Sequence, residues 1–134
     1  MFVYNILEDQ WEDTNTPMAQ KRRYHACLLI DEEEIIVTGG LYCGNGCKNL
    51  KSSEIYNLKQ RRWRPGPDFP TEISDAQFVK AKPGFKYLGY LIDYSAIYGL
   101  TKDMQRYEKI GDLKRLRNFH TAFVLSESIS EKCF

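Results

Sequence analysis

Hydrophobic residues recur along this chain in short runs that are separated by turn-forming and charged residues. In the first half of the chain these runs predict four strands, at residues 25–30, 34–38, 53–58 and 62–64. The acidic turn Asp31–Glu34 separates the first two strands. The segment Pro65–Pro67 ends the fourth, because proline and glycine interrupt a strand ladder. Aromatic residues make up 13% of the chain, which also favours strands over helices.

An internal repeat underlies this pattern. Tyr4 and Trp11 are seven residues apart, as are Tyr56 and Trp63, and each member of the second pair follows its counterpart by 52 residues. Segment 22–30 is similar to segment 117–125, and segment 74–79 fits between them as a weaker copy. A third tyrosine, Tyr107, follows Tyr56 by 51 residues. The repeat unit is therefore about 50 residues long, and its second copy is expected to have strands at 85–91 and 104–109.

The unit resembles the Kelch repeat, whose period is about 50 residues. The matching residues are the pair Gly39-Gly40 after a short hydrophobic strand, the segment Glu54–Asn57, and Trp63. The resemblance implies an all-β fold, a partial Kelch-type β-propeller made of four-stranded antiparallel blades. It divides the chain into the end of one blade at 1–22, a complete blade at 23–70, a degenerate blade at 71–116 and the start of the next blade at 117–134.

The signature residues of the repeat are expected to be structural. Gly39 and Gly40 allow a close backbone approach or a positive φ angle where the inner strands end. The aromatic members have large faces that suit burial in the core against a neighbouring blade. They are Tyr4, Trp11, Tyr56 and Trp63.

Repeat units of this kind bury their faces only against neighbouring units. The chain holds two to three units, fewer than the roughly 4–8 blades of a closed propeller. We therefore expect it to be part of a larger propeller, whose remaining blades are among its partners, with a truncated or incompletely predicted gene product as the alternative. For segment 108–123 the alternative is an amphipathic helix, because its apolar residues also have helical spacing.

Charge is balanced along the chain, with 19 Lys and Arg against 18 Asp and Glu. This balance gives no overall field that would attract nucleic acid or an anionic membrane, so neither is expected as a partner. No apolar run reaches the length of a membrane-spanning helix, and residues 1–5 lack the features of a signal peptide. A cytoplasmic location is favoured, and an extracellular one is the alternative.

Few residues offer catalytic chemistry. The two histidines, His25 and His120, occupy equivalent repeat positions, which is more typical of a structural role. No glycine-rich phosphate loop, serine nucleophile elbow or HExxH pattern occurs. We therefore expect no enzyme activity, no cofactor and no metal site.

The cysteines Cys43 and Cys47 flank an Asn45-Gly46 turn. Three states are open to this pair: free thiols, a disulfide bond, which needs an oxidising compartment, or a metal site, which would need two further ligands. Cys27 lies within an apolar strand and is expected to be a buried thiol. Cys133 is not assigned a role.

The loops at one end of the blades are the expected partner-binding surface, as the family resemblance implies. They cover residues 17–24, 41–51, 65–74, 93–101 and 113–119. The residues expected to contact a partner are Lys21, Arg22, Arg23, Tyr24, Tyr42, Asn45, Lys48, Arg115 and Arg117. The cations among them would suit an acidic peptide, because guanidinium groups clasp carboxylates. The alternative is that they are solvated charges that discourage aggregation.

The Kelch resemblance implies a non-catalytic protein–protein interaction module. Examples are the substrate-recognition part of a ubiquitin-ligase adaptor and a cytoskeletal scaffold. A secreted or cell-surface propeller that binds carbohydrate or protein is the first alternative, and a copper-oxidase-like propeller is the second.

Overall fold

The computed structural model describes residues 1–116, and within them the chain is all-β with antiparallel sheets and no helix. The strands are β1 (Phe2–Asn5), β2 (Gln10–Asp13), β3 (Ala26–Leu29), β4 (Glu34–Thr38), β5 (Leu41–Gly44), β6 (Gly46–Asn49), β7 (Ser53–Asn57), β8 (Arg62–Pro65), β9 (Gln77–Lys80), β10 (Tyr87–Ile92), β11 (Ala96–Thr101) and β12 (Tyr107–Asp112).

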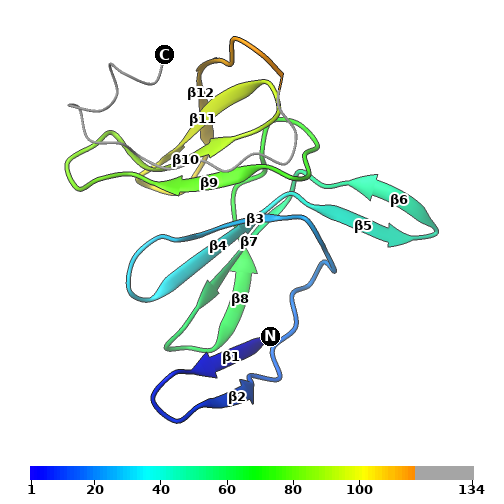
Figure 1. Ribbon diagram of the computed structural model, residues 1–134, viewed down its shortest axis with the longest axis vertical. Helices are drawn as coiled ribbons and strands as arrows, with labels where there is room; N and C mark the ends of the chain where they lie inside the picture. The colour runs from blue at the N-terminus through cyan, green and yellow to red at the C-terminus, as the bar shows by residue number, and fades with distance from the viewer. Residues whose placement is uncertain (117–134) are drawn as a thin grey trace.

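Two four-stranded sheets form the body of the molecule (Figure 1). The first sheet has the order β3-β4-β7-β8 and the second has the order β9-β10-β11-β12, so neighbouring strands pair in a meander. Two hairpins, β1–β2 and β5–β6, form separate two-stranded sheets. The hairpin β1–β2 lies beside β8 at the end of the molecule away from the second sheet (Figure 1).

The core lies between the two four-stranded sheets, where β3 meets β9. In β3 the alternation is that of a half-buried strand, because Ala26 and Leu28 are buried while Cys27 and Leu29 are exposed. Phe69, in the segment that connects the sheets, is also buried in this core. Its ring centroid lies 4.6 Å from that of Tyr98 and 5.1 Å from that of Tyr107, both in edge-on contacts.

The polar end of Tyr107 is satisfied inside this core. Its hydroxyl lies 2.7 Å from Thr38 Oγ1, which in turn accepts a hydrogen bond of 2.9 Å from Ser53 Oγ. A buried hydroxyl without a partner would destabilise the fold. This chain of hydroxyls therefore links the second sheet to the two central strands of the first.

Two consecutive glycines end β4 because only glycine fits there. Gly39 and Gly40 have φ angles of 66° and 98°, a region that other L-residues rarely adopt. A Cβ on Gly39 would lie 2.7 Å from the carbonyl oxygen of Ile73, and one on Gly40 would lie 2.7 Å from that of Arg23. The glycine pair thus lets the loops into both sheets pass close to the end of β4.

Two expectations about secondary structure are wrong, and one alternative is excluded in part. Segment 41–51 is largely a hairpin, β5–β6, instead of an irregular loop. In the second sheet the third strand is β11, so segment 93–101 is mostly a strand and Tyr107 begins the fourth strand. The helix considered for 108–123 is excluded at 108–112, which belongs to β12.

The second error has a clear physical origin. Register pairs Tyr56 with Trp63 in the first sheet and Leu100 with Tyr107 in the second. Tyr107 therefore corresponds in position to Trp63, and the match of Tyr107 to Tyr56 by sequence spacing aligned two different strands. A shorter connection between β10 and β11, without an inserted hairpin, shifts the spacing in the second unit.

The burial of the N-terminal aromatic pair and of Cys27 also differs from what the sequence predicts. Tyr56 is 1% exposed, whereas Tyr4 and Trp11 are 41% and 71% exposed, so the expectation of core burial is wrong for the N-terminal pair. Cys27 is exposed instead of buried, because the face of β3 that carries it points away from the second sheet.

Candidate partner-binding surface

The hairpin β5–β6 projects from the body of the molecule, away from both four-stranded sheets (Figure 1). None of its strand residues is buried. It is anchored at its base by two backbone hydrogen bonds between Arg23 and Leu41, of 3.0 and 2.6 Å, and by a bridge between Leu50 and Ile73. The hairpin therefore presents its side chains to solvent on a fixed base.

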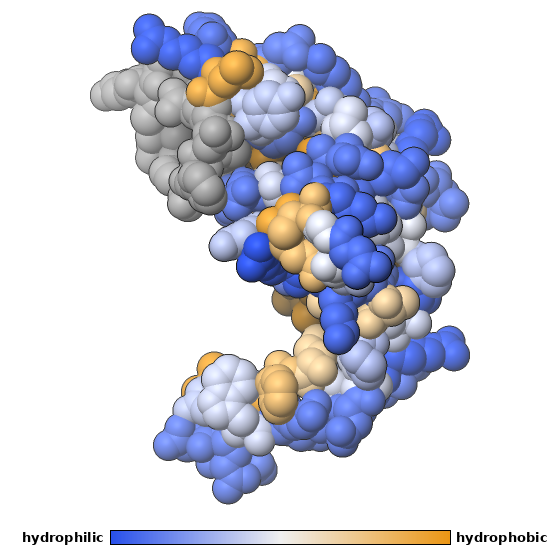
Figure 2. All heavy atoms as spheres, turned by 90° about the vertical axis from the view of Figure 1, so that its right-hand side faces the viewer, coloured by the Kyte–Doolittle hydropathy of each residue, from blue (hydrophilic) through white to orange (hydrophobic). Residues whose placement is uncertain are grey.

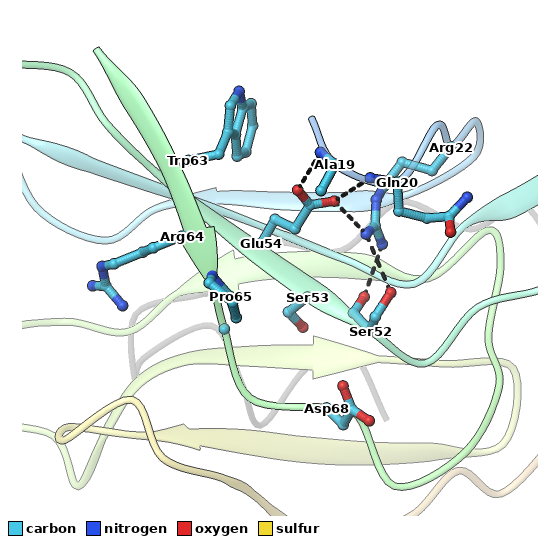
Figure 3. Close-up of a pocket in the computed structure, with 11 residues that line it drawn as sticks. Ala19, Gln20, Arg22, Ser52, Ser53, Glu54, Trp63, Arg64, Pro65 and Asp68 are labelled. Atoms are coloured by element: carbon cyan, nitrogen blue, oxygen red, sulfur yellow. Dashed lines mark hydrogen bonds and ion pairs between the residues drawn. The ribbon is translucent and has the colours of Figure 1, made fainter. Parts of the chain in front are cut away.

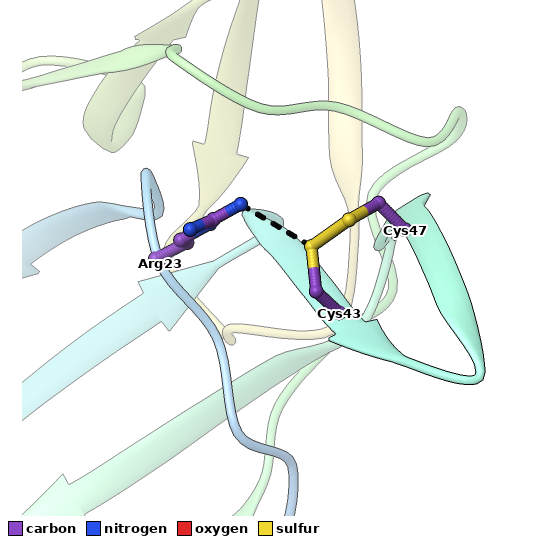
Figure 4. The surroundings of a disulfide bond; sticks show 3 residues. All are labelled: Arg23, Cys43 and Cys47. Atoms are coloured by element: carbon purple, nitrogen blue, oxygen red, sulfur yellow. Dashed lines mark hydrogen bonds between the residues drawn. A yellow bond between two sulfur atoms is a disulfide. The ribbon is translucent and has the colours of Figure 1, made fainter.

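A disulfide bond joins Cys43 to Cys47 across this hairpin (Figure 4). The register places the two cysteines directly opposite each other, with their Cα atoms 4.1 Å apart. The guanidinium of Arg23 lies against the bond, with Nη2 3.2 Å from Cys43 Sγ. Of the three states considered for this pair, the structure has the disulfide. The covalent link holds the two strands together around the turn at Asn45.

Cations gather around the hairpin without acidic partners. Lys21, Arg23 and Lys48 are exposed, and none of them forms an ion pair within residues 1–116. The Arg23 guanidinium lies 5.4 Å from the ring centroid of Tyr24, which is itself 55% exposed. The positive charge of these three side chains is therefore not neutralised by a direct ion pair within residues 1–116.

Two hollows adjoin the hairpin, and Tyr42 lines both of them. One, of about 240 Å³, is lined by Lys21, Arg23 and Tyr42 among others. The second, of about 400 Å³, lies at the turn and is lined by Tyr42, Asn45 and Lys48. We name the residues Lys21, Arg23, Tyr24, Tyr42, Asn45 and Lys48 the hairpin surface, and six of the nine expected binding residues lie on it.

Arg22, the expected binding residue that lies between Lys21 and Arg23 in the sequence, differs from its two exposed neighbours because its charge is already paired inside the fold. Its side chain is fully buried and forms an ion pair with Glu54, with Nη2 2.8 Å from Oε1 (Figure 3). The guanidinium also donates to the backbone oxygens of Gly39 and Ser52, each at 2.8 Å. Arg22 thus holds segment 17–22 onto the first sheet.

Glu54 is the residue that sequence reasoning missed. Its carboxylate also accepts hydrogen bonds from the backbone amides of Ala19 and Gln20, at 2.8 and 3.1 Å (Figure 3). These bonds fix segment 17–22 at the edge of a cavity of about 370 Å³. The available signal was an acidic residue directly before Ile55 and Tyr56 in a strand predicted to be buried, because buried carboxylates are almost always paired.

The two remaining predicted binding residues lie elsewhere. Arg115 is exposed after β12, and no hydrogen bond or ion pair in residues 1–116 joins it to the hairpin surface. Arg117 lies outside the described residues, as do His120, Cys133 and the predicted blade start at 117–134.

The opposite end of the first sheet has a different charge balance. In the turn after β3, Glu33 pairs with Lys59, and Glu34 at the start of β4 lies 2.9 Å from the guanidinium of Arg64. Two of the four acidic residues in the turn Asp31–Glu34 are thus paired with cations, whereas none of the three cations at the hairpin surface has an ion-pair partner within residues 1–116.

His25 lies beside Arg22 and is half-buried. Desolvation by burial, and then the charge of Arg22, lower the pKa of the His25 imidazole below its ordinary value. Its Nδ1 atom is buried and has no hydrogen-bond partner among the described residues. Within the same residues no group of three or more His, Cys, Asp and Glu side chains is placed to hold a metal ion.

No protein-family model matches the chain, and no curated protein is significantly similar to it. The class that the fold itself defines is therefore the broad one, an all-β protein of antiparallel four-stranded sheets. Among the described residues no helix is long and apolar enough to cross a membrane.

Proposed function

We propose that this chain is a non-catalytic protein-binding module built from Kelch-type propeller blades, and that it binds an acidic peptide segment of its partner at the hairpin surface. The single observation that carries the proposal is the uncompensated charge of Lys21, Arg23 and Lys48 around a rigid, projecting hairpin. Complementary charge steers a partner to a surface and fixes its orientation. A substrate-recognition role in a ubiquitin-ligase adaptor and a role in a cytoskeletal scaffold both use such a surface.

The Kelch-type blade is supported by the arrangement of the two sheets. Each is a four-stranded antiparallel meander, and they pack face to face with β3 against β9. The glycine pair ends the second strand of the first sheet, as in the repeat that the sequence resembles. Stacked four-stranded meanders are the building plan of a propeller.

A peptide-binding measurement tests the function. A fluorescent peptide of alternating glutamate and serine should bind the chain, and added salt should weaken it because exposed charges are screened. Lys48→Glu and Arg23→Glu should each weaken binding by about tenfold, equivalent to ~1.4 kcal/mol. The matched control is Lys102→Glu, which reverses an exposed, unpaired cation in the β11–β12 turn, at the opposite end of the second sheet.

Two outcomes would contradict the proposal: an affinity that the hairpin variants leave unchanged, or equal weakening by Lys102→Glu. The second would show that the peptide responds to net charge and has no defined site. A lysine–serine peptide of the same length should not bind.

A secreted or cell-surface module is the second candidate, and the Cys43–Cys47 disulfide favours it, because structural disulfides persist in oxidising compartments. Its ligand would be carbohydrate or protein. The same assay with neutral oligosaccharides distinguishes the two candidates, since only a carbohydrate-binding module would bind them in a salt-independent way.

A further inference from the structure

The N-terminal hairpin β1–β2 is an internal copy of β7–β8. Tyr4 pairs with Trp11 and Tyr56 pairs with Trp63 in the same register. The ring centroids are 5.1 Å apart in the first pair and 4.9 Å in the second, with interplanar angles of 45° and 51°. The two hairpins therefore have the same internal structure.

Their surroundings differ in one respect. Strand β7 pairs with β4 along its second edge, over all five residues from Ser53 to Asn57. Strand β1 has no partner along the corresponding edge within residues 1–116. An unpaired strand edge exposes backbone donors and acceptors that can pair with another strand.

The adjoining face of the first sheet is also uncovered. Leu29 is 46% exposed, Cys27 is exposed and Ile35 is half-buried. A cavity of about 520 Å³ lies here between this face and the N-terminal segment, and most of its lining residues are apolar, Pro17 and Met18 among them. Figure 2 shows a hollow between the lower, N-terminal part of the molecule and its centre, with apolar atoms beside it.

The interface between the two sheets shows which element covers the equivalent face of the second sheet. Cys27 pairs with Val37 in the first sheet, and Phe78 pairs with Leu91 at the corresponding place in the second. Phe78 packs in the core and Leu91 is completely buried there, beneath the hairpin β3–β4. A hairpin of the β3–β4 type is thus the element that covers this face of a sheet.

Two unsatisfied polar atoms lie at the same place. Arg22 Nε and His25 Nδ1 are buried without a hydrogen-bond partner among the described residues. Both residues line the cavity beside Cys27. Buried polar atoms are almost always paired in folded proteins, so the wall of this cavity carries two polar groups that the described residues do not satisfy.

We propose that the free edge of β1 and the outer face of β3–β4 together form a docking site for one β-hairpin. The occupant is a hairpin of the β3–β4 type from a sister repeat of the same protein. Its inner strand adds to β1 to complete a four-stranded sheet, and its apolar face packs on Cys27, Leu29 and Ile35. The inference rests on the proposed blade architecture and names the site at which the module joins its neighbour.

The test extends the full chain by a copy of its own residues 24–52, placed directly before Met1. Met1 aligns with Ser53, so the added hairpin reaches β1 in the register that β4 has on β7. Alanine replaces the three cysteines of the added copy, which leaves Cys27 as the reporter. Peptide mapping distinguishes Cys27 from Cys133.

Docking should raise Tm by roughly 5 °C or more and slow alkylation of Cys27 by iodoacetamide by about tenfold, because the thiol becomes covered. Two matched controls carry Ile36→Pro or Leu28→Glu in the added copy only. The first removes a ladder hydrogen bond and the second places a charge in the apolar contact, so both should restore fast alkylation.

Unchanged Cys27 alkylation in the extended chain overturns the proposal, and so does equal protection by the Ile36→Pro control. Protection of Cys27 in the unextended chain, together with a dimeric mass, also overturns it, because a second copy would then occupy the site. Binding of the acidic peptide at Lys48 is read out separately, so failure of this docking site and failure of the proposed function are distinguishable.

Discussion

The two hairpins β1–β2 and β7–β8 have the same register and the same Tyr–Trp pair, but the first strand is exposed in β1–β2 and buried in β7–β8. Tyr56, in β7, pairs with Ile35 of β4, and its hydroxyl accepts a hydrogen bond from Thr16. The residue is only 1% exposed. Tyr4 makes the same cross-strand contact with a tryptophan and remains 41% exposed. The repeat therefore encodes pairing within the hairpin, whereas burial depends on the strands around it.

The comparison also separates two sources of stability. The cross-strand aromatic contact is common to both hairpins and contributes about 0.5–1.5 kcal/mol beyond burial. The hairpin β7–β8 also gains the pairing of β7 with β4 and the hydrogen bond of 2.9 Å from Trp63 Nε1 to the backbone oxygen of Thr16, which have no counterparts at β1–β2 within residues 1–116. Equivalent substitutions in the two hairpins should therefore have unequal effects.

The largest difference is expected for the two tyrosines. Tyr56→Ala should lower the free energy of unfolding by about 3–5 kcal/mol, the range for large aromatic truncations in a core. Tyr4→Ala should lower it by less than about 1 kcal/mol, as for a surface site. Urea denaturation followed by circular dichroism measures both. Equal losses would show that Tyr4 is buried in solution, and Tyr56→Phe serves as the control that keeps the ring.

A somewhat smaller loss of stability is expected two residues before each tyrosine, at Glu54 in β7 and at Phe2 in β1. Glu54→Ala leaves the buried Arg22 guanidinium unpaired and should cost about 3 kcal/mol. Phe2, the counterpart of Glu54 in β1, is 66% exposed, and Phe2→Ala should cost less than about 1 kcal/mol. The same denaturation experiment measures both variants.

The double replacement of Arg22→Met and Glu54→Leu tests whether the unpaired Arg22 charge causes the loss of stability in Glu54→Ala. Apolar residues of similar volume remove both charges together, so most of the stability should return. A loss as large as that of Glu54→Ala would show instead that the hydrogen bonds to Ala19 and Gln20 matter more than the charge pairing.

The smallest effect is a dependence on pH at the uncovered face. The pKa of His25 is lowered, so the folded state binds this proton less readily than the unfolded state does. The stability from His25 is therefore present above the unfolded value of about 6.5 and is lost as pH falls through the lowered folded value. His25→Gln should flatten the stability curve between about pH 7 and pH 5, measured by denaturation at each pH. An identical slope in both proteins would contradict this assignment.

The ends of the four strands in the first sheet were predictable from the sequence to within one residue. The predicted strand 34–38 is β4 itself, and the predicted strand 53–58 exceeds β7 by one residue. Local signals were strong there, because alternating apolar residues, the acidic turn and the proline-rich stop all agree. The hairpin β5–β6 was not predicted, since glycine and asparagine mask the short strands on either side of the turn.

The binding surface was predictable only in part. The triplet Lys21, Arg22 and Arg23 reads as one basic cluster, yet the structure buries the middle residue and exposes its two neighbours. Burial of Arg22 depends on Glu54, which is 32 residues away in the chain. Sequence spacing alone does not show such a long-range pairing.

Amide hydrogen exchange tests most directly whether context, and not the repeat sequence, separates the two hairpins. Peptides that cover β7 should exchange slowly, near the rate of global unfolding, because both edges of this strand are paired. Peptides that cover β1 should exchange much faster, through local opening at the free edge. Equal protection of β1 and β7 in the monomeric chain would contradict this conclusion.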